Sequence, residues 1–182
     1  MPKKTRTAWE LLSAEVAFEA GPFLTVVRES VRTPSGRVVD DYYRIVLPDF
    51  VVVHVETENG LIVCLEQEKR AVGRASLTLP GGVVNSREDH LAAARRELLE
   101  ETGYEADDWV HLGSFIVNGN QGCGTGHFYK AAKARPVAEA DSGDLETMEI
   151  RLVDKTELLS AVKDGRVALM NHAACIAMAS MT

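Results

Sequence analysis

The 182-residue sequence lacks the features that mark secreted, membrane-spanning or nucleic-acid-binding proteins. Its three cysteines, Cys64, Cys123 and Cys175, are far apart and odd in number, which fits neither a disulfide framework nor a zinc cluster. We therefore expect them to be small buried apolar residues. No apolar stretch is long enough to cross a bilayer, and none follows the basic residues near the start, so we expect a cytoplasmic protein.

Positive charge is also scarce. Lysine and arginine number 20 against 27 acidic residues, which leaves a net charge of −7 and disfavours a broad electrostatic contact with nucleic acid or an anionic membrane. The sequence is 46% hydrophobic and 26% charged, as in an ordinary globular protein with a sizeable core. One domain is the simplest expectation.

Two acidic segments stand out against this background. Residues 86–108 hold eight carboxylates and three arginines, and residues 139–157 hold seven carboxylates, one arginine and one lysine. Each segment therefore carries −5, whereas the rest of the chain sums to +3. Such segments are either solvated faces or groups that converge around hard cations.

The first third of the chain predicts strands joined by turns. Runs rich in β-branched and aromatic residues at 23–27 and 42–47 flank a turn signal at Pro34–Gly36, which predicts a hairpin. The runs at 51–55 and 61–65 are almost continuously apolar, and a tight-turn dipeptide precedes the second. We expect these two to be central strands buried on both faces.

The rest of the chain predicts a helix, three strands and two further helices. Apolar residues recur at a spacing of three to four from about residue 89 to 101, and Gly103 stops this helix. Further strands are expected at 110–117, 126–132 and 148–153, followed by helices ending near 163 and 179. Four glycines between residues 118 and 126 are expected to prevent regular structure there, in a surface loop or a segment that approaches a ligand closely.

Three glutamates lie on one turn of the predicted central helix. Glu97, Glu100 and Glu101 fall at positions i, i+3 and i+4, so they share one face, where each like-charge pair costs a few tenths of a kcal/mol. The turn is either a solvated face or a site for a hard cation such as Mg²⁺ or Mn²⁺.

The residues around this turn follow a specific spacing. Five residues separate Gly82 from Glu88, and seven separate Glu88 from Arg96-Glu97-Leu98. One residue then precedes Glu100-Glu101, and one more precedes Gly103-Tyr104. This spacing matches the Nudix box at every fixed position, with Tyr104 where the family prefers an aliphatic residue. The chain therefore resembles the Nudix hydrolases.

The box also makes physical sense residue by residue. Gly81 and Gly82 allow a tight loop that aims a backbone carbonyl at a metal ion, and Arg96 can orient the neighbouring acids by ion pairing. Glu88 stands at the junction of loop and helix, where we expect it to stabilise both.

The resemblance implies a fold and a set of metal ligands. The fold is α/β, an α/β/α sandwich with a mixed central sheet and an N-terminal antiparallel β hairpin extension. Glu97 and Glu101 are the principal ligands, Glu100 is a ligand or a catalytic carboxylate that positions water, and the Gly81 carbonyl completes the set. The implied cofactor is Mg²⁺, with Mn²⁺ as an alternative, and the implied reaction is cleavage of a diphosphate.

Over nearly its full length the chain is similar to the ADP-ribose pyrophosphatase branch of the family. This implies hydrolysis of ADP-ribose, or of a related nucleoside diphosphate sugar, to AMP and ribose 5-phosphate in the ADP-ribose case. It also implies a homodimer in which residues 1–48 form a β extension for dimerisation and the substrate pocket, and residues 49–182 form the hydrolase domain. Three positions depart from the branch pattern, namely Lys69, Thr78 and Asn120 where Arg, Glu and Pro are usual, which leaves the exact sugar open.

The resemblance also indicates a general base and phosphate-binding residues. Glu146 is the best-placed base in the second acidic segment, and Glu149 is the alternative; either is otherwise a solvated surface acid. Side chains that would bind the substrate are Arg44, Lys69, Arg70 and His127.

Two other functions are compatible with the box. A Nudix-like module can sense nucleotides without cleaving them, although such modules tend to have a broken box or an added DNA-binding domain. A hydrolase of nucleoside triphosphates is the other alternative, and the N-terminal extension argues against it.

Overall fold

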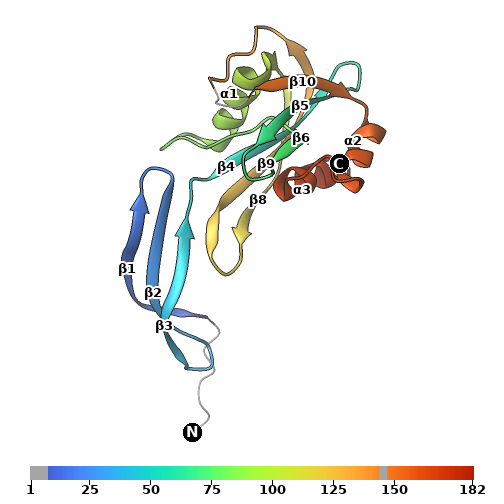
Figure 1. Cartoon of the computed structure of the whole chain (residues 1–182). Coiled ribbons are helices and arrows are strands. Elements are labelled where there is room, and N and C mark those ends of the chain that lie inside the picture. Colours follow the sequence, from blue (N-terminus) through green and yellow to red (C-terminus); the bar gives the residue numbers. More distant parts are fainter. Residues whose placement is uncertain (1–7, 144–146) are drawn as a thin grey trace. The chain divides into compact units, whose positions relative to one another are not determined.

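The computed structural model describes residues 8–143 and 147–182, which form two compact units (Figure 1). Of the described residues, the first unit contains 8–48 and 116–125, and the second contains 49–115, 126–143 and 147–182. The chain thus changes unit at residue 48, and the first unit also includes a later segment of ten residues.

Three antiparallel strands make up most of the first unit: β1 (Glu10–Ala20), β2 (Leu24–Arg32) and β3 (Val38–Val46). The predicted hairpin is β2–β3, whose turn is closed by a bond from the amide of Thr33 to the carbonyl of Arg37, 2.8 Å long. Residues 116–125 join this unit through the amide of Ile45, which donates to the carbonyl of Gln121 at 2.8 Å.

A mixed sheet forms the centre of the second unit, in the order β9-β4-β5-β10. Strand β9 runs parallel to β4, whereas β4–β5 and β5–β10 are antiparallel pairs. Strand β6 pairs with β5, and β7 and β8 pair with β9. The strand bounds are β4 (Phe50–Thr57), β5 (Ile62–Lys69), β6 (Arg74–Thr78), β7 (Tyr104–Glu105), β8 (Asp108–Asn118), β9 (Gly122–Pro136) and β10 (Met148–Val153).

Helices cover both faces of this sheet (Figure 1). On one side Val51 and Val53 of β4 share a buried cluster with Leu98, and on the other Val52 shares a second cluster with Leu158. This alternation explains why residues 51–55 are almost continuously apolar, and it confirms the predicted α/β/α sandwich. The helices are α1 (His90–Thr102), α2 (Lys155–Lys163) and α3 (Met170–Ala179).

The glycine-rich segment is more regular than predicted. The expectation that residues 122–126 lack regular structure is wrong, since β9 begins at Gly122. Gly122 and Gly124 adopt positive φ of 89° and 78°, and a Cβ on Gly124 would lie 2.8 Å from the carbonyl oxygen of Pro48. These glycines thus allow a strand to start with unusual dihedrals and to pass close to neighbouring backbone.

The cysteine prediction is right for two of the three residues. Cys64 and Cys175 are buried, and burial raises the pKa of each thiol to about 12, whereas Cys123 is half-buried. Within residues 8–143 and 147–182, no helix is long and apolar enough to cross a membrane.

Candidate functional site

Helix α1 carries the predicted acidic turn and has well-defined ends. The carboxylate of Asp89 caps its start by accepting bonds from the amides of Leu91 and Ala92, at 2.9 and 3.2 Å. Gly103 ends it in the left-handed conformation, at φ 71°, with its amide bonded to the carbonyl of Leu99. Helix α1 therefore holds the acidic turn in a fixed position on the sheet.

The loop before α1 lies directly against two of the three glutamates. The amide of Gly81 donates to Oε2 of Glu101 at 2.7 Å, and Glu101 is only 5% exposed. A Cβ on Gly82 would lie 2.5 Å from the carboxylate carbon and both oxygens of Glu97. Glycine at position 82 is therefore needed for the loop to approach the acidic turn this closely.

The backbone of this loop is fixed to strand β4. The amides of Val51 and Val53 donate to the carbonyls of Gly82 and Pro80, each at 2.9 Å. This ladder uses the carbonyls on either side of Gly81 and holds the Gly81 peptide beside Glu101.

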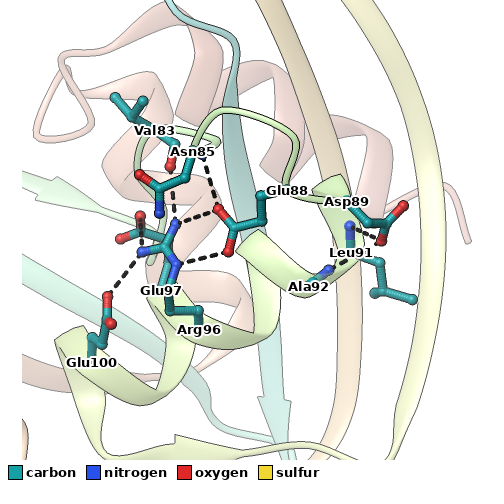
Figure 2. Close-up of polar contacts among 9 residues, drawn as sticks. All are labelled: Val83, Asn85, Glu88, Asp89, Leu91, Ala92, Arg96, Glu97 and Glu100. Atoms are coloured by element: carbon teal, nitrogen blue, oxygen red, sulfur yellow. Dashed lines mark hydrogen bonds and ion pairs between the residues drawn. The ribbon is translucent and has the colours of Figure 1, made fainter.

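Arg96 joins the acidic turn to the loop through a network of bonds (Figure 2). Its guanidinium donates to both oxygens of Glu88 at 2.9 and 3.0 Å, to Glu97 at 2.8 Å, to Glu100 at 2.9 Å and to the carbonyl of Val83 at 3.0 Å. Glu88 also accepts a bond from the amide of Asn85 at 2.9 Å. One cation thus connects three carboxylates from two segments of the chain.

The charged groups in this network shift one another's pKa values. Hydrogen bonds from Arg96 lower the pKa of Glu88 to about 2, with a smaller contribution from the Asn85 amide. The same carboxylates, Glu88 first, raise the pKa of Arg96. Both groups therefore stay charged at neutral pH, and the network persists as a set of ion pairs.

The donor set suits a hard divalent cation. Glu97, Glu100 and Glu101 offer carboxylate oxygens, and the loop can add the backbone carbonyl of Gly81; oxygens of these kinds are the ligands that Mg²⁺ and Mn²⁺ prefer. Arg96 supplies one positive charge against these three carboxylates, so the turn retains negative charge for a cation. The residues present therefore fit the implied metal ion.

The other predicted site residues are more scattered. Lys69 is the last residue of β5, and the exposed Arg70 lies in the turn after it. Arg44 belongs to β3 of the first unit, where its Nε lies 3.2 Å from Glu29. Of these substrate-binding candidates, Lys69 and Arg70 are thus neighbours in the second unit.

Of the two candidates for the general base, the structure describes only Glu149. Glu146 lies outside the described residues. Glu149 is on β10, where its side chain is 72% exposed and lies 3.8 Å from the guanidinium of Arg151.

Thr78, one of the departures from the branch pattern, is part of the core. It is 1% exposed, accepts a bond from Nε2 of Gln67 at 2.8 Å and donates to the carbonyl of Leu65 at 3.2 Å. A neutral buried pair between β5 and β6 therefore stands where the branch usually has a carboxylate.

His127 belongs to a cluster that the sequence does not reveal. It lies beside His90 and His111, so that one potential ligand atom of each residue lies within 4.8 Å of the others. These residues are 16 to 37 positions apart, on α1, β8 and β9, and no regular spacing could have indicated that they meet.

Comparisons with known proteins cover both parts of the chain. Residues 47–170 match the family described as "NUDIX domain", and residues 9–45 match "Nucleoside diphosphate sugar hydrolase N-terminal domain". The structure is similar to a solved structure described as "Crystal structure of ADP compounds hydrolase", with a TM-score of 0.84, 15% identity and coverage of 98% of this chain and 95% of the other. That likeness shows the fold.

Three relatives are between 26% and 31% identical to the chain over the aligned residues. A CMP-5'-(N-acetyl-N-hydroxy-3-aminopropyl)phosphonate hydrolase of Streptomyces rubellomurinus is 28% identical over 79% of this chain and 69% of its own. A methanol dehydrogenase activator of Bacillus methanolicus is 31% identical over 66% of this chain and 65% of its own. An ADP-ribose pyrophosphatase of Bacillus subtilis is 26% identical over 82% of this chain and 83% of its own.

Proposed function

The chain belongs to the Nudix family and is a hydrolase, and we propose that it cleaves the diphosphate of ADP-ribose or a related nucleoside diphosphate sugar with the help of Mg²⁺. The observation that carries the proposal is the acidic turn of α1, packed against the Gly81–Gly82 loop and connected to it by Arg96. The match of residues 9–45 to the N-terminal domain of nucleoside diphosphate sugar hydrolases supports this substrate class.

In the proposed mechanism the chain's own groups hold and orient the reactants. Glu97, Glu101 and the Gly81 carbonyl would hold the ion, and Glu100 would add a ligand or position the attacking water. A bound Mg²⁺ would supply charge neutralisation on the phosphates and make a water more acidic. Glu146 would accept the proton of the attacking water, with Glu149 as the alternative.

The reaction needs only water as a second substrate. Water adds to one phosphorus of the diphosphate, the bridging P–O bond breaks, and the products from ADP-ribose are AMP and ribose 5-phosphate. Lys69 and Arg70 would contribute positive charge to phosphate binding.

The first test is a substrate panel assayed with and without Mg²⁺. We expect the purified protein to convert ADP-ribose to AMP and ribose 5-phosphate only when Mg²⁺ is present, with product identity checked by chromatography. The panel also includes CMP joined to a phosphonate, because one relative is named for that substrate, as well as dinucleotides and nucleoside triphosphates. Turnover of the triphosphates alone would contradict the proposed substrate class.

The matched variant for this assay is Glu101→Gln. A glutamine keeps a carbonyl oxygen to accept the bond from the Gly81 amide but removes the charge that would hold the ion, so we expect kcat to fall by at least about 100-fold. Glu105→Gln, an exposed change just beyond the helix, serves as the control and should retain wild-type activity. Full activity of Glu101→Gln would refute the ligand assignment.

We also propose that the protein is a homodimer formed through its first unit. Strand β1 exposes large apolar side chains, with Leu11 59%, Val16 62% and Phe18 54% exposed. Exposed apolar patches on a small protein mark surfaces that are covered by a partner.

A further inference from the structure

Three histidines of the second unit come together away from the acidic turn. His90 is the first residue of α1, whereas His111 lies on β8 and His127 on β9. The rings of His90 and His127 are stacked, with centroids 4.5 Å apart and an interplanar angle of 11°, and the rings of His90 and His111 are 5.3 Å apart at 25°. One ring nitrogen of each residue lies within 4.8 Å of the other two.

An imidazole binds a metal ion through a ring nitrogen that carries no proton. Each of the three rings has two nitrogens, so each can offer one to an ion while the other contacts a hydroxyl group.

Hydroxyl groups next to the rings provide the secondary contacts that are usual for histidine ligands. The Ser114 hydroxyl lies 3.1 Å from Nε2 of His111 and 2.8 Å from Nδ1 of His127, and the Tyr129 hydroxyl contacts Nδ1 of His90. Such contacts fix the ring orientation and the tautomer of ligating histidines.

We propose that His90, His111 and His127 bind a transition-metal ion of the Zn²⁺ class. Three imidazole nitrogens are the ligand type that Zn²⁺, Co²⁺, Ni²⁺ and Cu²⁺ prefer, whereas Mg²⁺ prefers oxygen. A Zn²⁺ ion bound at its usual distance separates its ligand nitrogens by about 3.4 Å. The nitrogens therefore need to approach one another by at most about 1.4 Å from the present limit of 4.8 Å, and the stacked rings of His90 and His127 need to turn toward the ion.

This site is distinct from the acidic turn. His90 and Glu97 are seven residues apart on the same helix, which is about 10 Å along its axis. The two sites also differ in chemistry, because one offers carboxylates and the other imidazoles. An ion at the histidines would tie the start of α1 to the hairpin β8–β9, and binding would therefore raise the melting temperature of the protein.

The test is calorimetric titration of Zn²⁺ into the chelator-treated protein without an affinity tag, in excess Mg²⁺ to occupy the carboxylates. We expect one Zn²⁺ per chain and a higher melting temperature with Zn²⁺ than without. Titration with Co²⁺ should give the visible absorption of a nitrogen-coordinated ion. Lack of Zn²⁺ binding by the wild-type protein would overturn the proposal.

Variants show where the ion binds. His111→Gln changes an exposed side chain and should weaken Zn²⁺ binding by at least about tenfold, and His90→Gln should do the same. The matched control is Glu101→Gln, which alters the acidic turn and should bind Zn²⁺ as the wild type does. Unchanged binding by both histidine variants, or its loss in Glu101→Gln, would place the ion elsewhere and refute the assignment.

Discussion

Gly82 shows how one side-chain atom can decide the geometry of the site. An added Cβ would lie 2.5 Å from the carboxylate of Glu97, so that carboxylate has to move. We expect Gly82→Ala to lower kcat by about 100-fold, since displacement of a catalytic group by about 1 Å has effects of this size. Steady-state assays with ADP-ribose and Mg²⁺ measure the effect.

A second glycine provides the control for this change. Gly119 has no atom within 4 Å of an added Cβ, so Gly119→Ala should keep wild-type kcat. Both variants should have melting temperatures close to that of the wild type, because the added Cβ of Gly82→Ala displaces only the end of one side chain. If Gly82→Ala had wild-type kcat, the close approach of loop and acidic turn would have no part in catalysis.

At the scale of single residues, the sequence predicts those site residues that lie at a fixed spacing within one motif. Gly82, Glu88 and Arg96 belong to one contiguous motif, so their type and spacing alone are enough to identify the family. His90 and His111 carry no such signal, because the contact between them depends on how the sheet brings β8 to the start of α1. Residues that meet only through tertiary structure are the ones the sequence does not reveal.

At the scale of elements, the start of α1 depends on its cap. The Asp89 carboxylate accepts bonds from two amides that lack partners within the helix. Asp89→Ala should therefore lower the free energy of unfolding by about 1 kcal/mol, and urea unfolding measures the change.

The variant Asp89→Asn keeps a capping side chain and removes the negative charge. Asparagine also caps helices well, so this variant should unfold within a few tenths of a kcal/mol of the wild type. Equal destabilisation by both changes would mean that the charge of Asp89, and not its cap, supports the helix.

The predictability of each element follows from where its apolar residues lie. Strands β4 and β5 are buried on both faces and are evident in the sequence as apolar runs, and α1 is evident from its periodicity. The sequence does not predict strand β1. Nearly every side chain of β1 is exposed, so the strand has no buried face that would impose an alternation of apolar and polar residues. The sequence does not predict the start of β9 either, since the glycines there are strand residues with positive φ.

At the scale of the whole molecule, two buried histidines make stability depend on pH. Burial is the main cause that lowers the pKa of His54 and of His172 to about 4, helped by Lys130 and Lys69 respectively. In the unfolded chain both return to about 6.5. As the pH falls from 6.5 to 4, the unfolded chain takes up protons that the folded protein does not, so the free energy of unfolding decreases.

This pH dependence is measured by denaturant unfolding at several pH values in that window. His54→Leu removes one of the two protonation sites and keeps the position apolar, so its free energy of unfolding should fall less steeply between pH 6.5 and 4 than that of the wild type. A parallel decrease in both proteins would contradict a neutral buried His54.

The proposed dimer is also tested on the intact protein. Light scattering after gel filtration should give a mass of twice 19.9 kDa for the wild type. Phe18→Glu places a charge in the proposed interface and should give the monomer, whereas Met181→Glu, an equally drastic change at a residue 79% exposed near the C-terminus, should leave the dimer intact. A wild-type monomer at micromolar concentration would refute the proposal.

The bonds around Arg96 also bear on how tightly a cation can be held. Three carboxylates and the loop carbonyl of Val83 are already arranged by one guanidinium in the folded chain. The conformational entropy of ordering these side chains is therefore lost during folding and not when an ion arrives. If Glu97 and Glu100 hold an ion as proposed, its binding would be opposed by less entropy loss than with freely rotating glutamates.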